Sequence, residues 1–448
     1  MARTLMYSIY HPPERVRRRI LVVSLLIRDP TSAARAEQEA ADNNSVVTEP
    51  KADEEPAARR TRSRRVDRLP EEILVWEILV RLPARDILRC RAVCRSWRRL
   101  ASAPDFLFAH HRRQPSLPLV ALYSGTYSTN REAGLPILGR DRGRPVLGFD
   151  DYNDCDGFKL HSACDGLVLV RGSDGCFNIC NPATRQCAPL RSLDHINLKI
   201  AALYLHRPSG EYRILYWKES HWDGRRHKAA AWHILTVQRR SLPKCIGVPS
   251  DNPVIVKAMK ARNRRTPNNV DSPVMFGSCL HWKPGWLHNY VRGILIFDTV
   301  VESFRAMCCP SGSTNCDTRL CDVEGLIGFS CFGDGRTVAR IWVLEDYERE
   351  VWSFKYHVKF QVESLCRHTD TQHFILSHKG DMLVYSMSAR YMFHCDSTGK
   401  LLEEFRWNPM SHNLSITGHR FKESLVEHEF FMRRGAASAR QPSFFQRL

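Results

Sequence analysis

The chain has 448 residues, more than one ordinary compact domain holds, so two or three domains with connecting segments are expected. Hydrophobic residues make up 43% and charged residues 25%, a composition that excludes a fibrous or wholly disordered protein. The formal net charge of +18 resembles that of nucleic-acid-binding proteins, so its distribution along the chain matters. Sixteen cysteines over this length exclude a small disulfide scaffold.

Residues 1–65 are expected to form a disordered or weakly ordered basic leader and linker. The apolar run from Ile20 to Ile27 follows three arginines but is too short to span a bilayer as a helix. A secretory signal is the alternative, which the preceding prolines and the missing small-residue cleavage site disfavour. The arginine-rich stretch 59–65 is a nuclear import signal, a phosphate-contacting patch or a solvated flank of the next domain. No other segment looks transmembrane, and we expect a soluble protein of the cytoplasm, the nucleus or both.

A compact unit of three helices is predicted for residues 66–112. Pro70 suits a first helical turn, where its missing N–H has no partner, and Pro83 repeats this device at the start of a second helix. Apolar residues recur at three- and four-residue spacing, and arginines fill the positions between them in the third helix. The residues expected on the inner faces are Ile73, Leu74, Ile78 and Leu82, then Ile87 and Leu88, then Cys90, Val93, Cys94 and Trp97. The residues expected on the outer face are Arg89, Arg91, Arg95, Arg98 and Arg99.

Residues 115–430 change to short β-like runs broken by Gly, Asp, Asn and Ser. An acidic or amide turn recurs at Asn181, Asp298, Asp346 and Asp396, with 48 and 50 residues in the last two gaps. A period near 50 residues with about four strands in each repeat predicts propeller blades, about six of them. Tryptophans at strand positions suit the space between packed blades. A pair of irregular β-sandwiches is the alternative, and residues 431–448 are expected to be a disordered tail.

The helical unit resembles an F-box. The matching stretches combine two Leu-Pro steps with a Cys-Arg-x-Val-Cys-x-x-Trp run in the family's order and spacing. Two positions depart from the pattern. The position of Asp86 is often basic or polar in the family, and Trp76 is bulkier than the usual residue. Neither change affects the main apolar positions. The stretches are Leu69-Pro70-Glu71-Glu72-Ile73-Leu74, Ile78-Leu79-Val80-Arg81-Leu82-Pro83 and Leu88-Arg89-Cys90-Arg91-Ala92-Val93-Cys94-Arg95-Ser96-Trp97.

The remainder is similar to the F-box-associated, kelch-like β-propeller domains of plant F-box proteins. Two runs carry this resemblance, Cys164-Asp165-Gly166-Leu167-Val168-Leu169 and Ile179-Cys180-Asn181-Pro182-Ala183-Thr184. The paired glycines of true kelch blades are mostly missing here. Together the two resemblances imply an α+β multidomain protein, with a small three-helix F-box followed by an all-β, propeller-like domain of about six blades.

The resemblance implies a substrate-recognition subunit of a Skp–cullin–F-box ubiquitin ligase. The F-box would bind the Skp-type adaptor, and through it the cullin and RING subunits, while the β domain would hold an unknown target protein. A helical unit this small buries little area by itself and leaves apolar side chains for a partner. The residues expected to line the adaptor interface are Leu69, Pro70, Ile73, Leu74, Ile78, Leu82, Pro83, Leu88 and Val93, while Cys94 and Trp97 belong either to that interface or to the internal packing.

Three loops of the β domain are candidates for target binding, at 217–230, 258–272 and 309–322. The second is basic, which suits an acidic or phosphorylated target, although a solvated basic loop is the simpler interpretation. Its basic residues are Lys260, Arg262, Arg264 and Arg265.

No metal, cofactor or catalytic motif is recognised in the sequence. The cysteines form no C-x-x-C pair, and the cluster Cys308, Cys309, Cys316 and Cys321 lacks the tight pairs of structural zinc, so scattered reduced thiols are the simpler interpretation. The run Gly328–Phe332 lacks the last glycine of a nucleophile elbow, and no H-E-x-x-H occurs. We therefore expect a non-catalytic adaptor subunit without a cofactor.

Three other classes stay open: a basic nucleic-acid-binding protein, a non-ligase scaffold and a β-propeller enzyme. Residues 1–70 carry 14 basic and 10 acidic side chains, and residues 71–113 carry 9 and 5, so the charge excess is spread along the whole chain. A diffuse excess bears on solubility and localisation, and it does not by itself indicate nucleic-acid binding.

Overall fold

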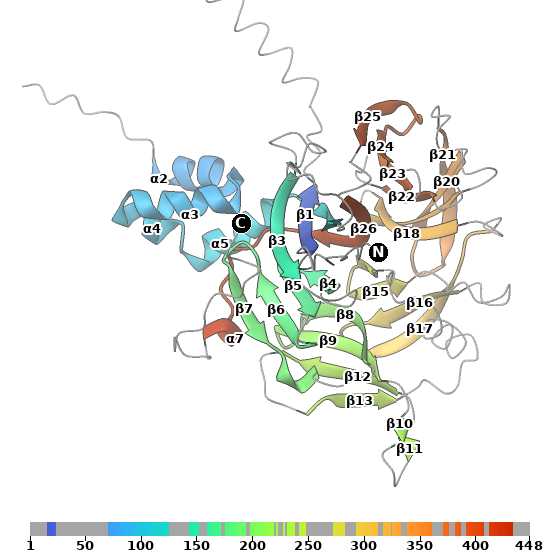
Figure 1. Ribbon diagram of the computed structural model, residues 1–448, viewed down its shortest axis with the longest axis horizontal. Helices are drawn as coiled ribbons and strands as arrows, with labels where there is room; N and C mark the ends of the chain where they lie inside the picture. Colours follow the sequence, from blue (N-terminus) through green and yellow to red (C-terminus); the bar gives the residue numbers. More distant parts are fainter. Residues whose placement is uncertain are drawn as a thin grey trace, which may run out of the picture.

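A helical unit stands beside a ring of β-sheets in this protein (Figure 1). No helix in the part of the chain described below is long and apolar enough to cross a membrane. The computed structural model describes residues 16–23, 70–124, 143–151, 159–171, 175–193, 198–218, 221–222, 227–228, 231–237, 242–247, 272–282, 293–311, 317–323, 325–332, 338–360, 371–375, 381–386, 391–406 and 412–432.

The first helix of the unit is not a regular α-helix. Its middle is a π-helical turn, in which the Leu79 N–H reaches back to the Leu74 carbonyl, and this wider turn changes which side chains face inward. The structure buries Val75, Leu79 and Val80, whereas a 3.6-residue period predicted an inner face containing Ile73 and Ile78, which are exposed. The elements are α2 (Glu71–Ile73), η1 (Leu74–Ile78) and η2 (Leu79–Arg81), followed by α3 (Ala84–Val93), α4 (Arg95–Leu100) and α5 (Pro104–Arg113).

The prediction of one inner helical face from Cys90 to Trp97 is wrong. The chain is extended at Cys94, which separates α3 from α4 and accepts a hydrogen bond from the Trp97 N–H through its Sγ, 3.4 Å away. Two predicted outer-face arginines stabilise the break. Arg98 donates to the Arg91 carbonyl at 3.0 Å, and Arg91 donates to the Ala101 carbonyl at 2.9 Å. Carbonyls at a helix end lack intrahelical partners, so cationic donors there are favourable.

Five antiparallel sheets of four strands follow one another along the chain, with a small β10–β11 hairpin projecting from the second sheet (Figure 1). The first is β4 (Lys159–Cys164), β5 (Leu167–Arg171), β6 (Phe177–Asn181) and β7 (Gln186–Pro189). The second is β8 (Leu198–His206), β9 (Glu211–Lys218), β12 (Ala231–Thr236) and β13 (Lys244–Gly247), with β10 (His221–Trp222) and β11 (His227–Lys228) between β9 and β12. The third is β14 (Val274–Phe276), β15 (Cys279–Trp282), β16 (Gly293–Asp298) and β17 (Ser303–Cys308). The fourth is β18 (Asp317–Val323), β19 (Leu326–Phe332), β20 (Val338–Asp346) and β21 (Val351–Lys359), and the fifth is β22 (Thr371–Ile375), β23 (Met382–Ser386), β24 (Tyr391–Cys395) and β25 (Leu401–Arg406).

A sixth four-stranded sheet is assembled from distant parts of the chain and contacts β4 through β26. Its order is β26 (His412–Phe421), β2 (Leu117–Ser124), β1 (Val16–Val23) and β3 (Gly143–Asp151). Where the sequence predicts about six blades, the structure thus has five blades of strands in chain order and one composite sheet. Within the leader that the sequence predicts to be weakly ordered, residues 16–23 form β1, which pairs with β2 and β3 on its two sides.

The hydrophobic core lies between neighbouring sheets. One buried cluster joins Trp217 and Trp232 of the second blade to Trp282 and Phe297 of the third. Similar clusters join the first blade to the second, the third to the fourth and the fourth to the fifth. The prediction that large aromatic side chains fill the space between blades is therefore confirmed for these three tryptophans.

The predicted recurring turns are confirmed. Each of Asn181, Asp298, Asp346 and Asp396 ends the third strand of a blade, and its side-chain oxygen accepts hydrogen bonds from backbone N–H groups two to four residues further on. Such Asx turns hold the connection to the fourth strand in a fixed shape. They lie at the same end of the strands as the turns between first and second strands, because alternate hairpins of an antiparallel sheet turn at the same end.

Residues 422–432, here called the C-terminal strap, run from β26 between the helical unit and the first blade. Leu425 is buried in the core of the helical unit. The Glu423 carboxylate accepts the Ala84 N–H at 3.0 Å and so caps α3, whose own N-cap residue, Pro83, has no capping side chain. The strap ends in α7 (Glu429–Met432), and Phe430 packs into the core between the first and second blades.

The β4–β5 turn fixes the strap against the first blade. Asp165 and Gly166 both have positive φ, as the two central residues of a type I′ turn require. A Cβ on Gly166 would overlap the Ser424 side chain and lie 2.9 Å from the Lys422 carbonyl oxygen. Ser424 is buried, and its carbonyl accepts a hydrogen bond from the Asn181 side chain at 3.0 Å. Glycine is therefore required here both for its backbone angle and for the space it leaves.

We predict that Gly166→Ala displaces the strap. The change costs about 1–2 kcal/mol for the left-handed backbone, and about 1–3 kcal/mol more for the overlap with Ser424. Gly210→Ala is the matched control, because Gly210 also has a positive φ, of 67°, but nothing lies within 4 Å of its added Cβ. Thermal unfolding and limited proteolysis of both variants measure the difference. Equal losses in the two variants would show that the strap does not press on Gly166.

A second prediction concerns pH. Burial lowers the pKa of His428 in the strap to about 4, with Asp165 opposing and His111 adding to the effect. The unfolded chain takes up the proton near pH 6.5, so stability falls as pH drops from about 6.5 towards 4. In His428→Gln, the free energy of unfolding should depend less on pH than in the wild type, by at most about 1.4 kcal/mol per pH unit. Thermal unfolding at several pH values measures this difference. Substitution of the exposed His357 by Gln is the control, and an equal change in both variants would contradict the prediction.

Candidate functional site

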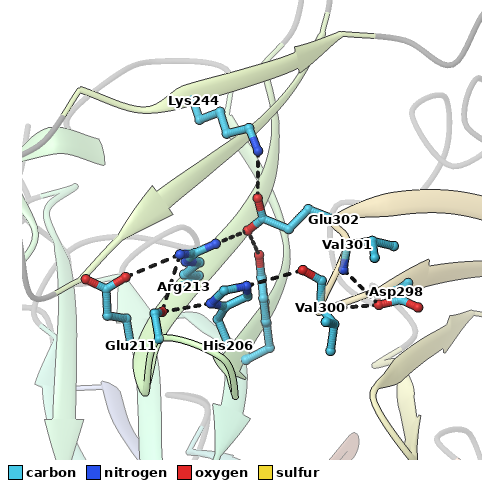
Figure 2. Close-up of polar contacts among 10 residues, drawn as sticks. His206, Glu211, Arg213, Lys244, Asp298, Val300, Val301 and Glu302 are labelled. Carbon is cyan, nitrogen blue, oxygen red and sulfur yellow. Dashed lines mark hydrogen bonds and ion pairs between the residues drawn. The ribbon is translucent and has the colours of Figure 1, made fainter.

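A cluster of polar and charged side chains lies between the second and third blades (Figure 2). The Glu302 carboxylate comes from the β16–β17 turn and accepts hydrogen bonds from Arg213, from Lys244 at 2.8 Å and from the Tyr204 hydroxyl at 3.0 Å. The Glu302 side chain is 5% exposed. Burial alone would raise its pKa, but the hydrogen bonds from Lys244 and Arg213 lower it below the ordinary value. Glu302 is thus a charged side chain with its partners already in place.

His206, which lies near Glu302, does not form a catalytic arrangement with the Glu302 carboxylate. Its Nδ1 lies 2.7 Å from the Ser209 hydroxyl, and its Nε2 lies 3.3 Å from the Val300 carbonyl oxygen, so both ring nitrogens of His206 have partners. A serine nucleophile would need a base that is in turn oriented by a third group, whereas the Glu302 carboxylate binds Tyr204, Arg213 and Lys244. The cluster of Figure 2 is therefore a contact between blades.

The exposed apolar side chains of the helical unit form the strongest candidate binding surface. The exposed fractions are 44% for Ile73, 40% for Ile78, 37% for Leu88 and 66% for Val93. Pro70, Pro83 and Cys94 are also exposed, whereas Leu74, Leu82 and Trp97 are partly buried and pack against the internal core. The structure thus divides the predicted interface residues into an outer set and a supporting set. For Cys94 and Trp97, it places the first at the surface and the second in the packing.

Two predicted stretches of the F-box pattern meet at this surface. The Ser96 hydroxyl of α4 donates to the Glu71 carboxylate of α2 at 3.4 Å. This contact brings the start of α2, next to Pro70 and Ile73, close to the α3–α4 junction, next to Val93 and Cys94. In Figure 1, α2, α3 and α4 extend away from the β-sheets, so this side of the unit is open to a partner.

Two exposed aromatic side chains were not among the predicted interface residues. Trp76 is 41% exposed and lies three residues after Ile73, on the same side of the helical turn. Phe108 is 54% exposed, whereas Phe106, two residues earlier on α5, is buried. Aromatic residues are enriched at interface hot spots, and the bulk of Trp76 against the F-box pattern was the available signal.

Four arginines of the helical unit make contacts within the unit. Arg81 pairs with Glu77 at 2.5 Å and Arg89 with Asp86 at 3.1 Å, while Arg91 and Arg98 bind backbone carbonyls. A patch that binds nucleic acid needs cations free to contact phosphates. Arg91 and Arg98, which bind backbone carbonyls, are therefore less available for phosphate contacts.

Several predicted positions lie outside the described residues. These are Leu69 of the adaptor interface, the basic loop residues Lys260, Arg262, Arg264 and Arg265, and the arginine-rich stretch 59–65. Within the described part of the chain, no three His, Cys, Asp or Glu side chains are grouped to hold a metal ion. Cys331 is disulfide-bonded, which corrects the interpretation of scattered reduced thiols for this residue.

Solved structures with weak similarity to this chain share little sequence with it. They include AztD from Citrobacter koseri (10% identity, TM-score 0.35, covering 70% of this chain and 85% of that chain) and a streptogramin B lyase structure (10%, 0.29, 57% and 71%). A functionally unknown protein from Desulfotomaculum acetoxidans gives 7% identity and a TM-score of 0.32, covering 68% of this chain and 85% of that chain. Similarities at these scores do not indicate the fold or the function of this chain. No curated protein sequence matches the chain significantly.

Comparison with models of protein families gives two matches that follow the two parts of the structure. Residues 66–114 match the F-box-like domain, and residues 150–428 match the F-box associated beta propeller domain. The second match spans more than half of the chain and includes all five blades built in chain order. The chain therefore belongs to the family of proteins with an F-box-associated β-propeller domain, here preceded by an F-box-like domain.

Proposed function

We propose that this protein is the substrate-recognition subunit of a Skp–cullin–F-box ubiquitin ligase. The F-box binds a Skp-type adaptor, which links the protein to cullin and RING subunits, and the propeller binds a target protein. In this proposal the chain transfers nothing itself, because ubiquitin transfer belongs to its partners. It acts in the cytoplasm, the nucleus or both.

The observation that carries this proposal is the exposed apolar surface on helices held in place by a buried core. Four apolar residues of the F-box pattern are exposed, while Val80 and Ile87 behind them are fully buried. The four exposed residues are Ile73, Ile78, Leu88 and Val93. Large apolar side chains on a small, rigid unit support docking to a partner surface rather than internal packing. Trp76 adds an aromatic side chain to the same helical turn as Ile73.

The topology supports target binding at the end of the strands that faces away from the F-box. The helical unit and the strap rest on the β4–β5 and β6–β7 turns, which lie at one end of the first blade. The connections from second to third strands, and from blade to blade, leave from the opposite end. A target held there would not compete with the adaptor for the same surface.

The adaptor interface is tested by placing a charge at two exposed positions. The substitutions are Leu88→Glu and Val93→Glu, and glutamate is a helix-forming residue that α3 can accommodate. Binding of the adaptor would then remove water from a carboxylate. Each substitution should therefore raise the Kd for a purified Skp-type adaptor about tenfold or more. Isothermal titration calorimetry with the full chain measures the change. Binding of the adaptor at wild-type strength by both folded variants would rule out this surface.

Matched controls come from the propeller. Val300 and Val301 are 39% and 68% exposed, close to the values of Leu88 and Val93, but they lie on the β16–β17 turn. Val300→Glu and Val301→Glu should leave the adaptor Kd unchanged. A loss of binding equal to that of the α3 variants would indicate a nonspecific effect of added charge, and would contradict the assignment to the F-box surface.

A further inference from the structure

Two cysteines face each other across the β6–β7 hairpin of the first blade. Cys180 and Cys187 are directly opposed in the strand register, and their sulfur atoms lie 2.8 Å apart. A disulfide bond is about 2.05 Å long and joins residues whose Cβ atoms lie about 3.5–4.5 Å apart. Opposed residues of antiparallel strands come close to this separation, at about 4.5–5.5 Å between Cβ atoms. Closing a bond between these two sulfurs therefore needs only a small shift.

The two thiols differ in their access to solvent. Cys180 is buried, whereas Cys187 is half-buried on β7, the outer strand of the blade. Burial, and after it the hydrogen bond and the electrostatic interaction with Cys187, raise the pKa of Cys180. Cys187 is consequently the thiol that a small oxidant meets first, and Cys180 is the neighbour positioned to react with the product.

We propose that Cys180 and Cys187 form a reversible disulfide when the protein meets a peroxide. The Cys187 sulfur attacks one oxygen of hydrogen peroxide, the O–O bond breaks, and a sulfenic acid and one water result. The Cys180 sulfur then attacks the Cys187 sulfur and expels the hydroxyl as a second water. The two thiols lose two electrons and two protons, and the peroxide is reduced to two waters. A thiol reductant reverses the reaction by exchange.

The pair lies at the base of the turn that carries the helical unit. Asn181 follows Cys180 and holds the strap through the Ser424 carbonyl, and Ala183 in the same turn packs against the core of the helical unit. The strap's last helix, α7, contacts β7. A disulfide here closes the hairpin covalently, so oxidation stiffens the part of the blade on which the F-box rests. This inference does not depend on the proposed ligase role.

The test uses trypsin, because Arg185 separates the two cysteines in the sequence. The full chain is treated with hydrogen peroxide, blocked with N-ethylmaleimide, digested without reductant and analysed by mass spectrometry. We expect residues 172–185 and 186–191 to appear as one linked peptide pair that dithiothreitol separates. Hydrogen exchange in the turn 182–185 should slow in the oxidised protein.

Cys176 lies on the same tryptic peptide as Cys180 and provides the matched control. Cys176→Ser should keep the linked pair, whereas Cys180→Ser and Cys187→Ser should each abolish it. Because the wild-type chain alone gives the main result, a variant that fails to fold does not affect the test. The proposal is overturned if Cys187 proceeds to sulfinic acid while Cys180 stays open to alkylation, or if peroxide links Cys187 to another cysteine.

Discussion

The close approach of Ser424 to Gly166 decides how the two parts of this protein sit together. The strap can pass over the β4–β5 turn only because Gly166 has no side chain there, and the buried Ser424 carbonyl then finds its partner on Asn181. With the strap in this position, Glu423 reaches the first turn of α3 and Leu425 enters the core of the helical unit. An unpaired buried carbonyl costs about 1–3 kcal/mol, so these contacts favour this position of the strap over positions that leave the Ser424 carbonyl without a partner.

Neighbouring blades are joined by contacts from the turn between the third and fourth strands. The residue at the end of the Asx turn has a positive φ at both Glu302 and Glu350, and in each case its carboxylate reaches the preceding blade. Glu302 binds three side chains of the second blade, while Glu350 accepts the Cys308 N–H of the third at 2.9 Å. The left-handed backbone costs about 1–2 kcal/mol at a residue other than glycine. The charged hydrogen bonds offset this cost, which explains why glutamate stands where glycine is usual.

Local signals in the sequence were enough to predict the helical unit, the Asx turns and the aromatic packing between blades. Each of these depends on residues close in the chain or on a repeated pattern. The inner face of the first helix was mispredicted because a π-helical turn changes the period, and nothing in the spacing of Ile73 and Ile78 reveals it. The break at Cys94 was missed for a similar reason, since the arginines that cap the two helix ends also fit a solvated face. The F-box resemblance assigned Ile73, Ile78, Leu88 and Val93 to an interface, whereas periodicity alone assigned them to the interior.

The motif Cys-Asp-Gly-Leu carries the resemblance to the propeller family, but its structural role could not be predicted from the sequence. Asp165 and Gly166 form the turn on which α5 and the strap rest, and the residues they contact lie far away in the chain. Such long-range contacts leave no periodic signal. The same holds for β1, whose partners β2 and β3 lie about a hundred residues further on.

The composite sheet explains why the helical unit has a defined position at all. β2 leads out of α5 and β26 leads into the strap, and these strands pair with Leu117 opposite Phe421. The end of α5 and the start of the strap are therefore side by side, where Lys422 donates to the Arg112 carbonyl at 2.8 Å. The helical unit is attached to the propeller by two chain segments instead of one linker, so a rotation about either segment is resisted by the other. In the proposed role as a substrate receptor, this construction would hold a bound target at a fixed distance from the adaptor.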